Sequence, residues 1–562
     1  MLFMGPSSPN FIMKLLTYYH TIKYLKLSQI FYRLLRRFKH PKPNDLAAIV
    51  DQKSGKWVTQ ALYEQKLFLN NKVKFLNREG QLPDQASWNN ESFEKLWLYN
   101  LHYFDDLNAV DADSRRELQI STINKWILEN PAPKGNGWEP YPTSLRIVNW
   151  VKAFLSGLKP EQSMLDSLAK QSDFLSQDLE RHLLGNHLFV NAKALIFAGT
   201  YLKGKESAEW LLTGLDIYRK ELEEQVLDDG GNFELTPMYH VIMLVDLLDF
   251  INLWSAYPEK IDSNVVNQTR RVAFKMIYWL LGMSHLDGEI SFFNDSAFLI
   301  APKNSTVLEY AQKLGLINVD PIDVKHHSLN VYDFSDSGYV SVKTKEYSLI
   351  ADLAQVGPSY QPGHAHADTL SYELAIAGQR VFVNSGTSEY GLSAERLRQR
   401  KTAAHNTVVV DDLDSSQVWS GFRVAKRADV FDRFVGPCKD GTANFGASHN
   451  GFKKQGVACI HKREWLVTQE EIRVVDRLLG QYSNAIGFLH LHPGVQVVSA
   501  TGDVVELLIK GYKIFVEVHG GKISVESSSW HPEFGISIPS KKLSFIFFNN
   551  EIATSITWNK LD

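Results

Sequence analysis

Two hydrophobic patterns divide the chain. From about residue 50 to about residue 310, apolar residues recur three and four positions apart in long segments, which predicts amphipathic helices. The clearest segments are Ser144 to Leu158, Leu165 to Leu184, His187 to Leu202, Ala208 to Val226 and Tyr239 to Tyr257. No short repeat is visible, which disfavours a solenoid, but so many successive helices must pack as pairs. An incomplete α/α toroid is one arrangement that satisfies this.

After about Leu329 the pattern changes to short β-rich runs at close spacing, which predicts an antiparallel β-sandwich. The runs are Gly338 to Val342, Ser348 to Leu353, Arg380 to Val383, Asn406 to Val410, Val504 to Ile509, Ile514 to Val518, Ile523 to Glu526 and Leu543 to Phe548, with His519 to Lys522 as a hairpin turn. The fold class is therefore α+β and multidomain. We place the helical domain at residues 46–320 and the sandwich at residues 325–562, with a cleft expected between them.

Residues 1–45 form a separate basic segment that we predict to be helical. No acidic residue occurs before Asp45, and its apolar residues fall near helical spacing. Docking on the rest of the protein and attachment to a membrane surface are both compatible with this pattern. Lys14, His20 and Lys23 interrupt every candidate signal-peptide core, so the compartment stays open.

Composition limits the classes of function. With 562 residues, 44% of them hydrophobic, the chain is expected to form at least two globular domains. The formal net charge of −3 argues against a nucleic-acid protein driven by bulk electrostatics. No uncharged run of about 18 apolar residues predicts a transmembrane helix. We expect no organic cofactor, and the oligomeric state is left open.

Two polar clusters occur within the helical half. In GNHLFVNAKAL, His187 and Asn191 share a helix face and Asn186 stands at the helix start, where it is also a candidate N-cap. In DGGNFELTPMYH, Tyr239 begins a helix, and the positive end of the helix dipole there favours a phenolate. Each cluster alone is as compatible with packing as with catalysis.

Two further clusters occur within the β-rich half. In GHAHAD, strand-like alternation places His364, His366 and Asp368 on one face, a row that is costly to bury unless it pairs with a metal or a substrate. His405 opens a β run in AHNTVVVDD. General acid and base chemistry and a two-histidine metal site are both open interpretations.

The order of these clusters, with VNSGTSEYG between the last two and GWEPYPTSLR upstream, resembles the heparinase II/III family. The resemblance covers roughly residues 90 to 500. It implies an α/α toroid followed by an antiparallel β-sandwich, and a polysaccharide lyase that cleaves an acidic glycan by β-elimination. Relatives act on heparan, alginate and other acidic glycans, so the resemblance leaves the particular substrate open.

The resemblance also implies roles for individual residues. Asn186 and His187, with His364, neutralise the carboxylate of a uronic acid, which makes the C5 proton easier to remove. Tyr239 matches the family's catalytic tyrosine and acts as base, acid or both. His364, or alternatively Tyr390, serves when the proton and the leaving oxygen lie on opposite sides of the sugar.

His366 and His405 match positions that hold a structural metal in relatives, commonly zinc. The third family ligand is an aspartate, whereas this chain has Asn384. An amide in place of a carboxylate removes an anionic ligand, so zinc affinity is expected to fall. A zinc site and a cluster held by hydrogen bonds are both open.

Further residues are candidates for substrate binding, each about as compatible with a structural role. Arg146 is suited to a bidentate contact with a carboxylate or sulfate. The other candidates are Asn100, His102, Trp138, Glu139, Tyr141, Glu234 and Arg400.

Two alternatives compete with the lyase. A glycoside hydrolase needs two carboxylates at a controlled separation, for which Glu139, Glu234 and Asp295 are candidates. A non-catalytic glycan-binding or assembly protein of the same fold is the other, and Asn384 is its best support. A lyase leaves an unsaturated uronate that absorbs in the ultraviolet, whereas a hydrolase does not.

Overall fold

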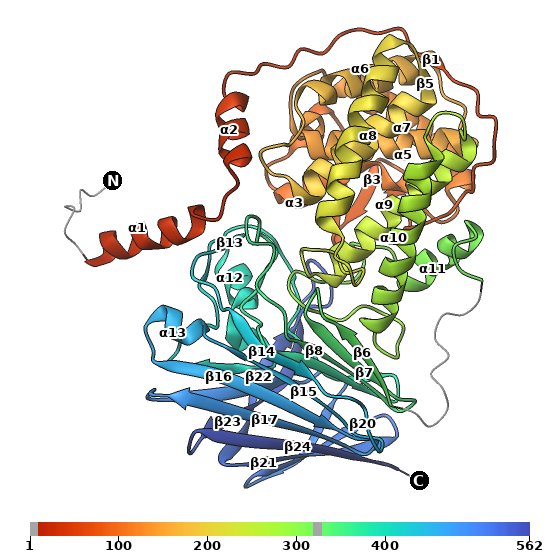
Figure 1. Ribbon diagram of the computed structural model, residues 1–562. Coiled ribbons are helices and arrows are strands. Elements are labelled where there is room, and N and C mark those ends of the chain that lie inside the picture. Colours follow the sequence, from red (N-terminus) through yellow and green to blue (C-terminus); the bar gives the residue numbers. More distant parts are fainter. Residues whose placement is uncertain (1–8, 319–328, 562) are drawn as a thin grey trace.

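The computed structural model describes residues 9–318 and 329–561, with helices at one end of the molecule and sheets at the other (Figure 1). Each of the five predicted helical segments contains a helix, although the second segment, Leu165 to Leu184, was predicted too long, because α6 ends at Gln177. The helices are α1 (Pro9–Ile22), α2 (Leu27–Arg36), α3 (Lys95–Tyr103), α4 (Arg116–Glu129), α5 (Pro140–Leu155), α6 (Gln162–Gln177), α7 (Gly185–Tyr201), α8 (Lys205–Gln225), α9 (Pro237–Ala256), α10 (Ser263–Gly282), α11 (Asn304–Lys313), α12 (Ala394–Arg400) and α13 (Gly451–Gln455).

Helices α3 to α11 form an incomplete α/α toroid in which α7 and α9 are central. Both helices are apolar on nearly every side and buried along almost their whole length, as expected for helices surrounded by other helices. Helix α7 packs against α5, α6, α8 and α9, and α9 packs against α10 and α11. Helix α9 is also long and apolar enough to cross a membrane, but most of it is buried inside the domain.

Two glycines allow α7 and α8 to approach closely. A Cβ atom at Gly199 would lie 2.5 Å from the carbonyl oxygen of Ser207, and one at Gly214 would lie 2.8 Å from that of Ala192. Neither contact is sterically tolerable. The close packing of these helices fixes α7, whose first turn carries Asn186 and His187.

The β-rich half contains three large sheets, and every paired strand within them is antiparallel. The eight-stranded sheet has the order β14 (Val430–Val435), β15 (Ala443–His449), β16 (Cys459–Val467), β17 (Glu471–Gly480), β24 (Glu551–Lys560), β21 (Tyr512–His519), β20 (Val504–Ile509) and β19 (Gln496–Thr501). The five-stranded sheet has the order β10 (Gln379–Phe382), β9 (Tyr372–Ile376), β8 (Tyr347–Asp352), β7 (Tyr339–Lys343) and β6 (Asn330–Phe334). The four-stranded sheet has the order β11 (Val408–Val410), β18 (Ala485–His490), β23 (Ile538–Phe547) and β22 (Gly521–Trp530).

These sheets pack as a β-sandwich around one apolar core, which contains side chains from all three. The predicted hairpin at His519 to Lys522 was wrong. Strand β21 pairs with β20 and β24, whereas β22 pairs with β23 in another sheet. Residues at this turn therefore carry the chain from one layer of the sandwich to the other, and local turn chemistry does not distinguish the two outcomes.

Small two- and three-stranded sheets complete the described structure. Strands β2 (Leu67–Phe68), β3 (Lys72–Phe75) and β4 (Arg78–Gln81) pair with one another, β1 (Ile49–Val50) pairs with β5 (Leu202–Lys203), and β12 (Val418–Trp419) pairs with β13 (Arg423–Val424).

The two domains share a buried interface. One apolar cluster combines Leu235, Trp279 and Phe293 from the helical side with side chains of β6, β7 and β8. Polar contacts cross the same interface: the Lys343 ammonium donates to the carbonyl oxygen of Ser284 at 2.5 Å, and Arg380 pairs with Asp287 at 2.7 Å. Groups contributed by different domains are therefore held in fixed relation at this junction.

Candidate active site

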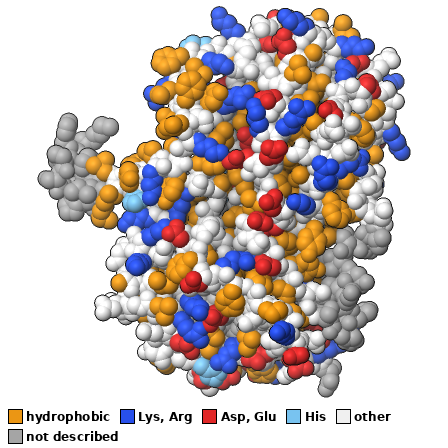
Figure 2. Space-filling view, in the orientation of Figure 1, with side chains coloured by type: hydrophobic (Ala, Val, Ile, Leu, Met, Phe, Trp, Pro, Cys, Tyr) orange, Lys and Arg blue, Asp and Glu red, His pale blue; other side chains and the backbone are white. Residues whose placement is uncertain are grey.

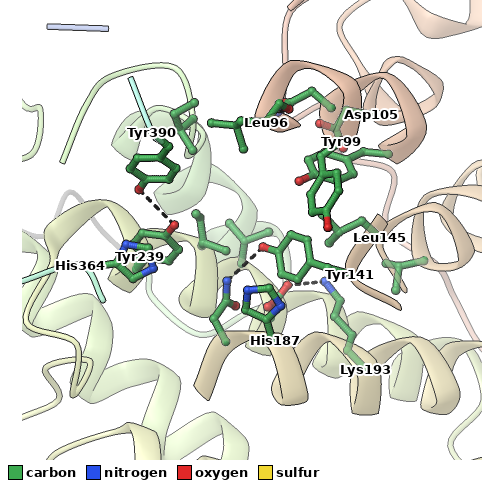
Figure 3. A pocket seen from close by; sticks show the side chains of 18 of the residues that line it. Leu96, Tyr99, Asp105, Tyr141, Leu145, His187, Lys193, Tyr239, His364 and Tyr390 are labelled. Atoms are coloured by element: carbon green, nitrogen blue, oxygen red, sulfur yellow. Dashed lines mark hydrogen bonds and ion pairs between the residues drawn. The ribbon is translucent and has the colours of Figure 1, made fainter. Parts of the chain in front are cut away.

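A cavity of about 690 Å³ lies at the junction of the two domains. All five residues that the sequence predicts to be catalytic line it: Asn186, His187, Tyr239, His364 and Tyr390. Figure 3 shows Tyr239, His364 and Tyr390 on one side of the cavity and Tyr141 and His187 on another. Volume and enclosure are typical of a site for a small molecule or for a short stretch of polymer.

The first turn of α7 presents an amide and an imidazole to the cavity. Asn186 Nδ2 donates to the hydroxyl of Tyr141 at 3.0 Å, so this side chain does not cap the helix. His187 Nδ1 lies 3.0 Å from Glu180 Oε1, and Asn191 Nδ2 donates to Glu180 Oε2 at 3.1 Å. The predicted shared face of His187 and Asn191 is thus used to hold one buried carboxylate.

Glu180 determines the charge of His187. Burial by itself lowers the pKa of His187, but the adjacent Glu180 carboxylate outweighs burial and raises that pKa above its ordinary value. Because Nδ1 donates to Glu180, the Nε2–H of the imidazolium is left for a ligand. Sequence reasoning missed Glu180, since a glutamate seven residues before His187 belongs to no recognised pattern.

Tyr239 stands in the first turn of α9, as predicted, and its hydroxyl lies 3.2 Å from that of Tyr390. Burial raises the pKa of both tyrosines well above the usual value. Burial thus opposes the phenolate that the helix dipole was expected to favour at Tyr239. Tyr239 therefore enters a reaction as a neutral phenol.

His364 lies beside Tyr239, with 4.1 Å between the ring centroids. The segment from His364 to Asp368 is a loop rather than the predicted strand, so strand alternation does not explain the arrangement of its side chains. Instead, His364 Nδ1 lies 2.9 Å from Asp295 Oδ2, and His366 Nε2 lies 2.8 Å from Asp295 Oδ1. His364 Nδ1 is the donor to this carboxylate, which leaves His364 Nε2 on the cavity side.

Asp295 is the centre of this arrangement. It lies in the loop between α10 and α11, is fully buried, and accepts two hydrogen bonds from the guanidinium of Arg396. Burial alone raises the pKa of Asp295, but Arg396 and the two histidines outweigh it and hold that pKa well below the usual range. A permanently ionised Asp295 fixes the tautomer of His364.

Glu234 is a buried carboxylate in the cavity wall, and one of its oxygens lies beside His364 without a hydrogen-bond partner in the described part of the chain. Its side chain is 3% exposed, and Oε2 has no hydrogen-bond partner among the described residues. That oxygen lies 3.7 Å from His364 Nε2. Burial raises the pKa of Glu234, which favours the protonated acid, a hydrogen-bond donor.

The predicted metal residues lie together behind His364. His366 Nδ1 is 3.3 Å from His405 Nε2, and Asn384 Oδ1 is 3.2 Å from His405 Nδ1. Asn384 and His366 thus contact opposite nitrogens of the His405 ring, so the three side chains do not converge on one point. The nearest carboxylate, Asp295, is paired with Arg396.

Hydrogen bonds connect the side chains of this cluster to one another and to Asp295. Burial lowers the pKa of His366 to about 4 and that of His405 well below its usual value, so both rings are neutral. Asn384 Nδ2 is buried without a partner. Asn384 Oδ1 also accepts the backbone N–H of Asn406 at 3.4 Å. Because Asn384 and His366 contact opposite nitrogens of His405, and Asp295 is paired with Arg396, these residues do not fit a zinc site.

The predicted substrate-binding residues divide into two groups. Asn100, Tyr141 and Glu234 line the cavity, and Glu139 lies at its edge, where it accepts hydrogen bonds from the cavity residues Lys95 and Tyr99. His102, Trp138, Arg146 and Arg400 are instead buried in the protein and do not line the cavity.

Contacts within the protein account for the buried group. Arg146 donates to Gln171 Oε1 at 2.7 Å and to the carbonyl oxygen of Gly137 at 2.7 Å, which uses its guanidinium in the core. His102 accepts from the indole nitrogen of Trp126 at 3.0 Å. Arg400 donates to the carbonyl oxygen of Ala365 at 2.9 Å and so supports the His364 loop. Sequence spacing indicated these polar side chains but not the direction in which they point.

A buried charge network forms part of the cavity wall. Lys193 Nζ lies 2.7 Å from both Asp246 Oδ1 and Asp249 Oδ2, and Lys152 Nζ lies 2.8 Å from Asp249 Oδ2. Sequence reasoning missed this network. Asp246 and Asp249, three apart in an otherwise apolar helix, were the available signal.

Two family models match the chain: "Heparinase II/III N-terminus" over residues 9–315 and "Heparinase II/III-like, C-terminal" over residues 327–559. A heparin-sulfate lyase of Bacteroides stercoris is 26% identical over 451 residues, covering 69% of this chain and 65% of the relative. One of Bacteroides thetaiotaomicron is 29% identical over 336 residues, covering 52% and 47% respectively. The chain thus spans at most 65% of these relatives' length.

Solved structures share the fold. A heparinase III crystal structure matches with a TM-score of 0.68 at 16% identity, covering 87% of this chain and 80% of that one. A heparan sulfate lyase, HepC, from Pedobacter heparinus matches with a TM-score of 0.56 at 17% identity, covering 88% and 82%. At such identity these matches establish the architecture of toroid and sandwich.

Proposed function

The chain belongs to the heparinase II/III family, and from this premise we propose that it is a polysaccharide lyase that cleaves a uronate-containing glycan by β-elimination. One observation carries the proposal. A charge-neutralising pair from α7, a neutral phenol from α9 and an aspartate-held imidazole from the sandwich face one cavity. These are the groups that elimination next to a carboxylate requires.

The first step neutralises the substrate carboxylate. The imidazolium of His187 and the amide of Asn186 donate hydrogen bonds to it. As the C5 proton leaves, negative charge spreads onto this carboxylate, so donors already in place stabilise the transition state more than the ground state. Glu180 keeps His187 charged for this role.

The second step moves two protons. His364 Nε2, with Nδ1–H held by Asp295, accepts the C5 proton; the C5–H electrons form the C4–C5 double bond as the C4–O bond breaks. Tyr239 gives its phenolic proton to the leaving oxygen, and Tyr390 hydrogen-bonds to Tyr239 at 3.2 Å. The products are one fragment that ends in a 4,5-unsaturated uronate and a second fragment that ends in a free hydroxyl. Where the C5 proton and the leaving oxygen lie on the same side of the sugar, Tyr239 would serve in both transfers only as a phenolate, which takes the C5 proton and returns it to the leaving oxygen, and burial disfavours that phenolate.

A glycoside hydrolase has weaker support. Of the three carboxylates that the sequence offers for hydrolysis, only Glu234 lines the cavity. Asp295 is buried against Arg396, and Glu139 is engaged by Lys95 and Tyr99. No pair among the three is placed to flank a glycosidic bond.

The charges of the cavity favour a glycan with few sulfates. No arginine among the described residues lines the cavity, and each of its lysines is already paired: Lys95 with Glu139, and Lys152 and Lys193 with α9 carboxylates. A sulfate would meet no unpaired guanidinium or ammonium there. The cavity therefore suits a uronate whose neighbouring sugar carries N-acetyl or hydroxyl groups.

The test is a panel of purified glycans read by ultraviolet absorbance of the unsaturated product. The panel includes highly sulfated heparin, the unsulfated N-acetylated backbone of the same glycan, chondroitin and alginate. We expect the unsulfated backbone to be cleaved faster than heparin. Turnover without ultraviolet absorbance would indicate a hydrolase. Binding without turnover, unchanged in Tyr239→Phe, would support the non-catalytic alternative.

We further infer that the cluster of His366, His405 and Asn384 functions without zinc. Its support is that Asn384 and His366 contact opposite nitrogens of the His405 ring, and that Asp295 is paired with Arg396. Elemental analysis of the purified protein should give much less than one zinc per chain, and a chelator should leave the melting temperature unchanged. Stoichiometric zinc, lost together with stability on chelation, would contradict this inference.

A further inference from the structure

The segment from Met13 to Phe38 carries an unusual concentration of exposed apolar side chains. This segment, here called the N-terminal arm, contains α1 and α2, which lie outside the helical domain in Figure 1. Of the 29 large hydrophobic side chains that are exposed in the described structure, 12 belong to the arm. They are Met13, Leu15, Leu16, Tyr18, Tyr19, Ile22, Leu27, Ile30, Phe31, Leu34, Leu35 and Phe38.

Helix α2 turns its polar face toward the protein. Gln29 is buried and donates to the carbonyl oxygen of Leu183, and Arg36 pairs with Asp178 at 3.0 Å. The opposite face consists of residues spaced three and four apart, such as Leu27, Phe31 and Leu34, which are 83%, 59% and 53% exposed. A helix docked on its own domain normally buries the apolar face, so this orientation is the reverse of the ordinary one.

Helix α1 shows the same reversal. Its Thr17 and Thr21 hydroxyls contact Gln417 and Trp419 of the sandwich domain at 3.4 and 3.1 Å. Its apolar residues at spacings of three and four, from Leu15 through Ile22, face solvent. Apart from the ring of Tyr18, which lies 5.3 Å from that of Trp419, these contacts of both helices with the protein are polar. Both helices present hydrophobic surface outward, which Figure 2 shows mixed with basic side chains beside the grey N-terminal residues.

The positive charge of the arm indicates that it binds an anionic surface. Residues 1–44 contain eight of the chain's 60 Lys and Arg residues and none of its 63 Asp and Glu residues, which leaves 52 basic against 63 acidic residues in the remainder. Lys14, Arg33 and Arg37 make no ion pair within the described part of the chain. An anionic surface therefore attracts the arm and repels the body of the protein.

We propose that the N-terminal arm binds the surface of a lipid bilayer that contains anionic lipids, with its apolar face among the acyl chains and its basic residues at the headgroups. Exposed apolar and aromatic side chains flanked by Lys and Arg, without any acidic residue, are the features of helices that lie in a membrane interface. A protein partner would be expected to supply acidic side chains opposite the same cations, but the twelve exposed apolar side chains flanked by cations that make no ion pair within the described residues favour lipid.

This placement has a consequence for the cavity. The arm contacts Leu183, which lines the cavity, and Lys26 lies over the ring of Tyr360, the neighbour of the cavity residue Gln361. A protein bound through the arm would thus hold the cavity close to the bilayer, where it would meet glycan chains at or near the membrane. The binding itself does not depend on the lyase assignment.

The test is flotation of the full-length protein with vesicles of phosphatidylglycerol and phosphatidylethanolamine, compared with vesicles of phosphatidylcholine alone. We expect binding to the anionic vesicles, weakened by salt because the attraction is partly screened. The double variant Arg33→Glu, Arg37→Glu should lower partitioning at least roughly 25-fold, at about fivefold per basic residue. Leu34→Asp should lower it roughly tenfold or more.

Matched controls use exposed sites elsewhere. Leu212 on α8 is 69% exposed, so Leu212→Asp controls for Leu34→Asp, and Lys205→Glu controls for the charge reversals. All these positions are on the surface, and circular dichroism confirms that each variant is folded. Equal vesicle binding by arm variants and wild type, or no binding by wild type, would overturn the proposal. A dimer that Leu34→Asp dissociates, without vesicle binding, would assign the arm to self-association instead.

Discussion

Replacing Glu180 by Gln tests the charge of His187 most directly. Glu180 is 5% exposed, and its two oxygens accept hydrogen bonds from His187 at 3.0 Å and Asn191 at 3.1 Å. Glutamine has the same size and keeps one acceptor oxygen, but it removes the negative charge. The expected effect is therefore on the protonation of His187 rather than on packing.

The magnitude follows from the contact. A hydrogen bond between charged groups contributes about 1.5–3 kcal/mol. The His187 side chain is 35% exposed, so solvent screening favours the lower end, about 1.5 kcal/mol. At about 1.36 kcal/mol per pKa unit, the pKa of His187 should fall by about one unit in Glu180→Gln.

The direction of the pH dependence is fixed by the raised pKa of His187 in the folded protein. The charged imidazole binds the uronate, so kcat/KM should fall as the pH rises through that pKa, and this alkaline limb should move about one unit lower in Glu180→Gln. The stabilisation from the His187 and Glu180 pair is fully present below the unfolded pKa of His187, and it is lost as the pH rises through the folded pKa.

The assay is the initial rate of ultraviolet product formation from about pH 5 to about pH 9 under kcat/KM conditions. The control is Glu209→Gln, which removes an exposed carboxylate 3.8 Å from Lys205 on α8 and should leave the limb in place. An alkaline limb at the same pH in wild type and Glu180→Gln would refute the assignment of His187 as the charged donor.

Three further substitutions separate the remaining roles. Tyr239→Phe should lower kcat by about 10²–10⁴-fold, with little change in KM, whereas Tyr390→Phe should cost roughly tenfold or less because Tyr390 only hydrogen-bonds to Tyr239. Asp295→Asn should lower kcat by on the order of 10²-fold through the wrong tautomer of His364, and an unchanged kcat would exclude His364 as the base. Arg146→Ala should lower the free energy of unfolding by about 3 kcal/mol, which at about 2–4 °C per kcal/mol lowers the melting temperature by about 10 °C. The kcat, measured well below that temperature, should stay at the wild-type value.

Hydrophobic periodicity was sufficient to predict a helical half followed by a β-rich half, whereas the toroid was implied by the resemblance to the family. The helical segments from Ser144 onward and most β runs correspond to elements of the structure, because burial of one face or of a whole element leaves a regular trace in the sequence. The turn at His519 to Lys522 was the exception. Two strands that follow one another in sequence pair only if they join the same sheet, and contacts distant in sequence decide which sheet each strand joins.

The site could be predicted only in part. The residues of the motifs do line one cavity, because each motif places a polar group at the start of a helix or in a loop next to the domain junction. Arg146 and His102, also predicted to bind substrate, are buried in the core, and Glu180 and Asp295 act from outside the motifs. Side-chain direction and the partners of buried charges depend on tertiary packing, which spacing along one chain does not record.

Because the catalytic groups come from both domains, the rate of turnover should depend strongly on the relative position of the two domains. The proposed base comes from the sandwich, yet its orientation depends on Asp295 from the helical half, and the proposed acid from α9 hydrogen-bonds to Tyr390 on the other side. A small movement of one domain relative to the other would break the contacts of His364 with Asp295 and of Tyr239 with Tyr390, while each domain kept its own apolar core. On gentle heating or in dilute denaturant, turnover should therefore vanish before circular dichroism changes, so that inactivation and unfolding follow two different curves.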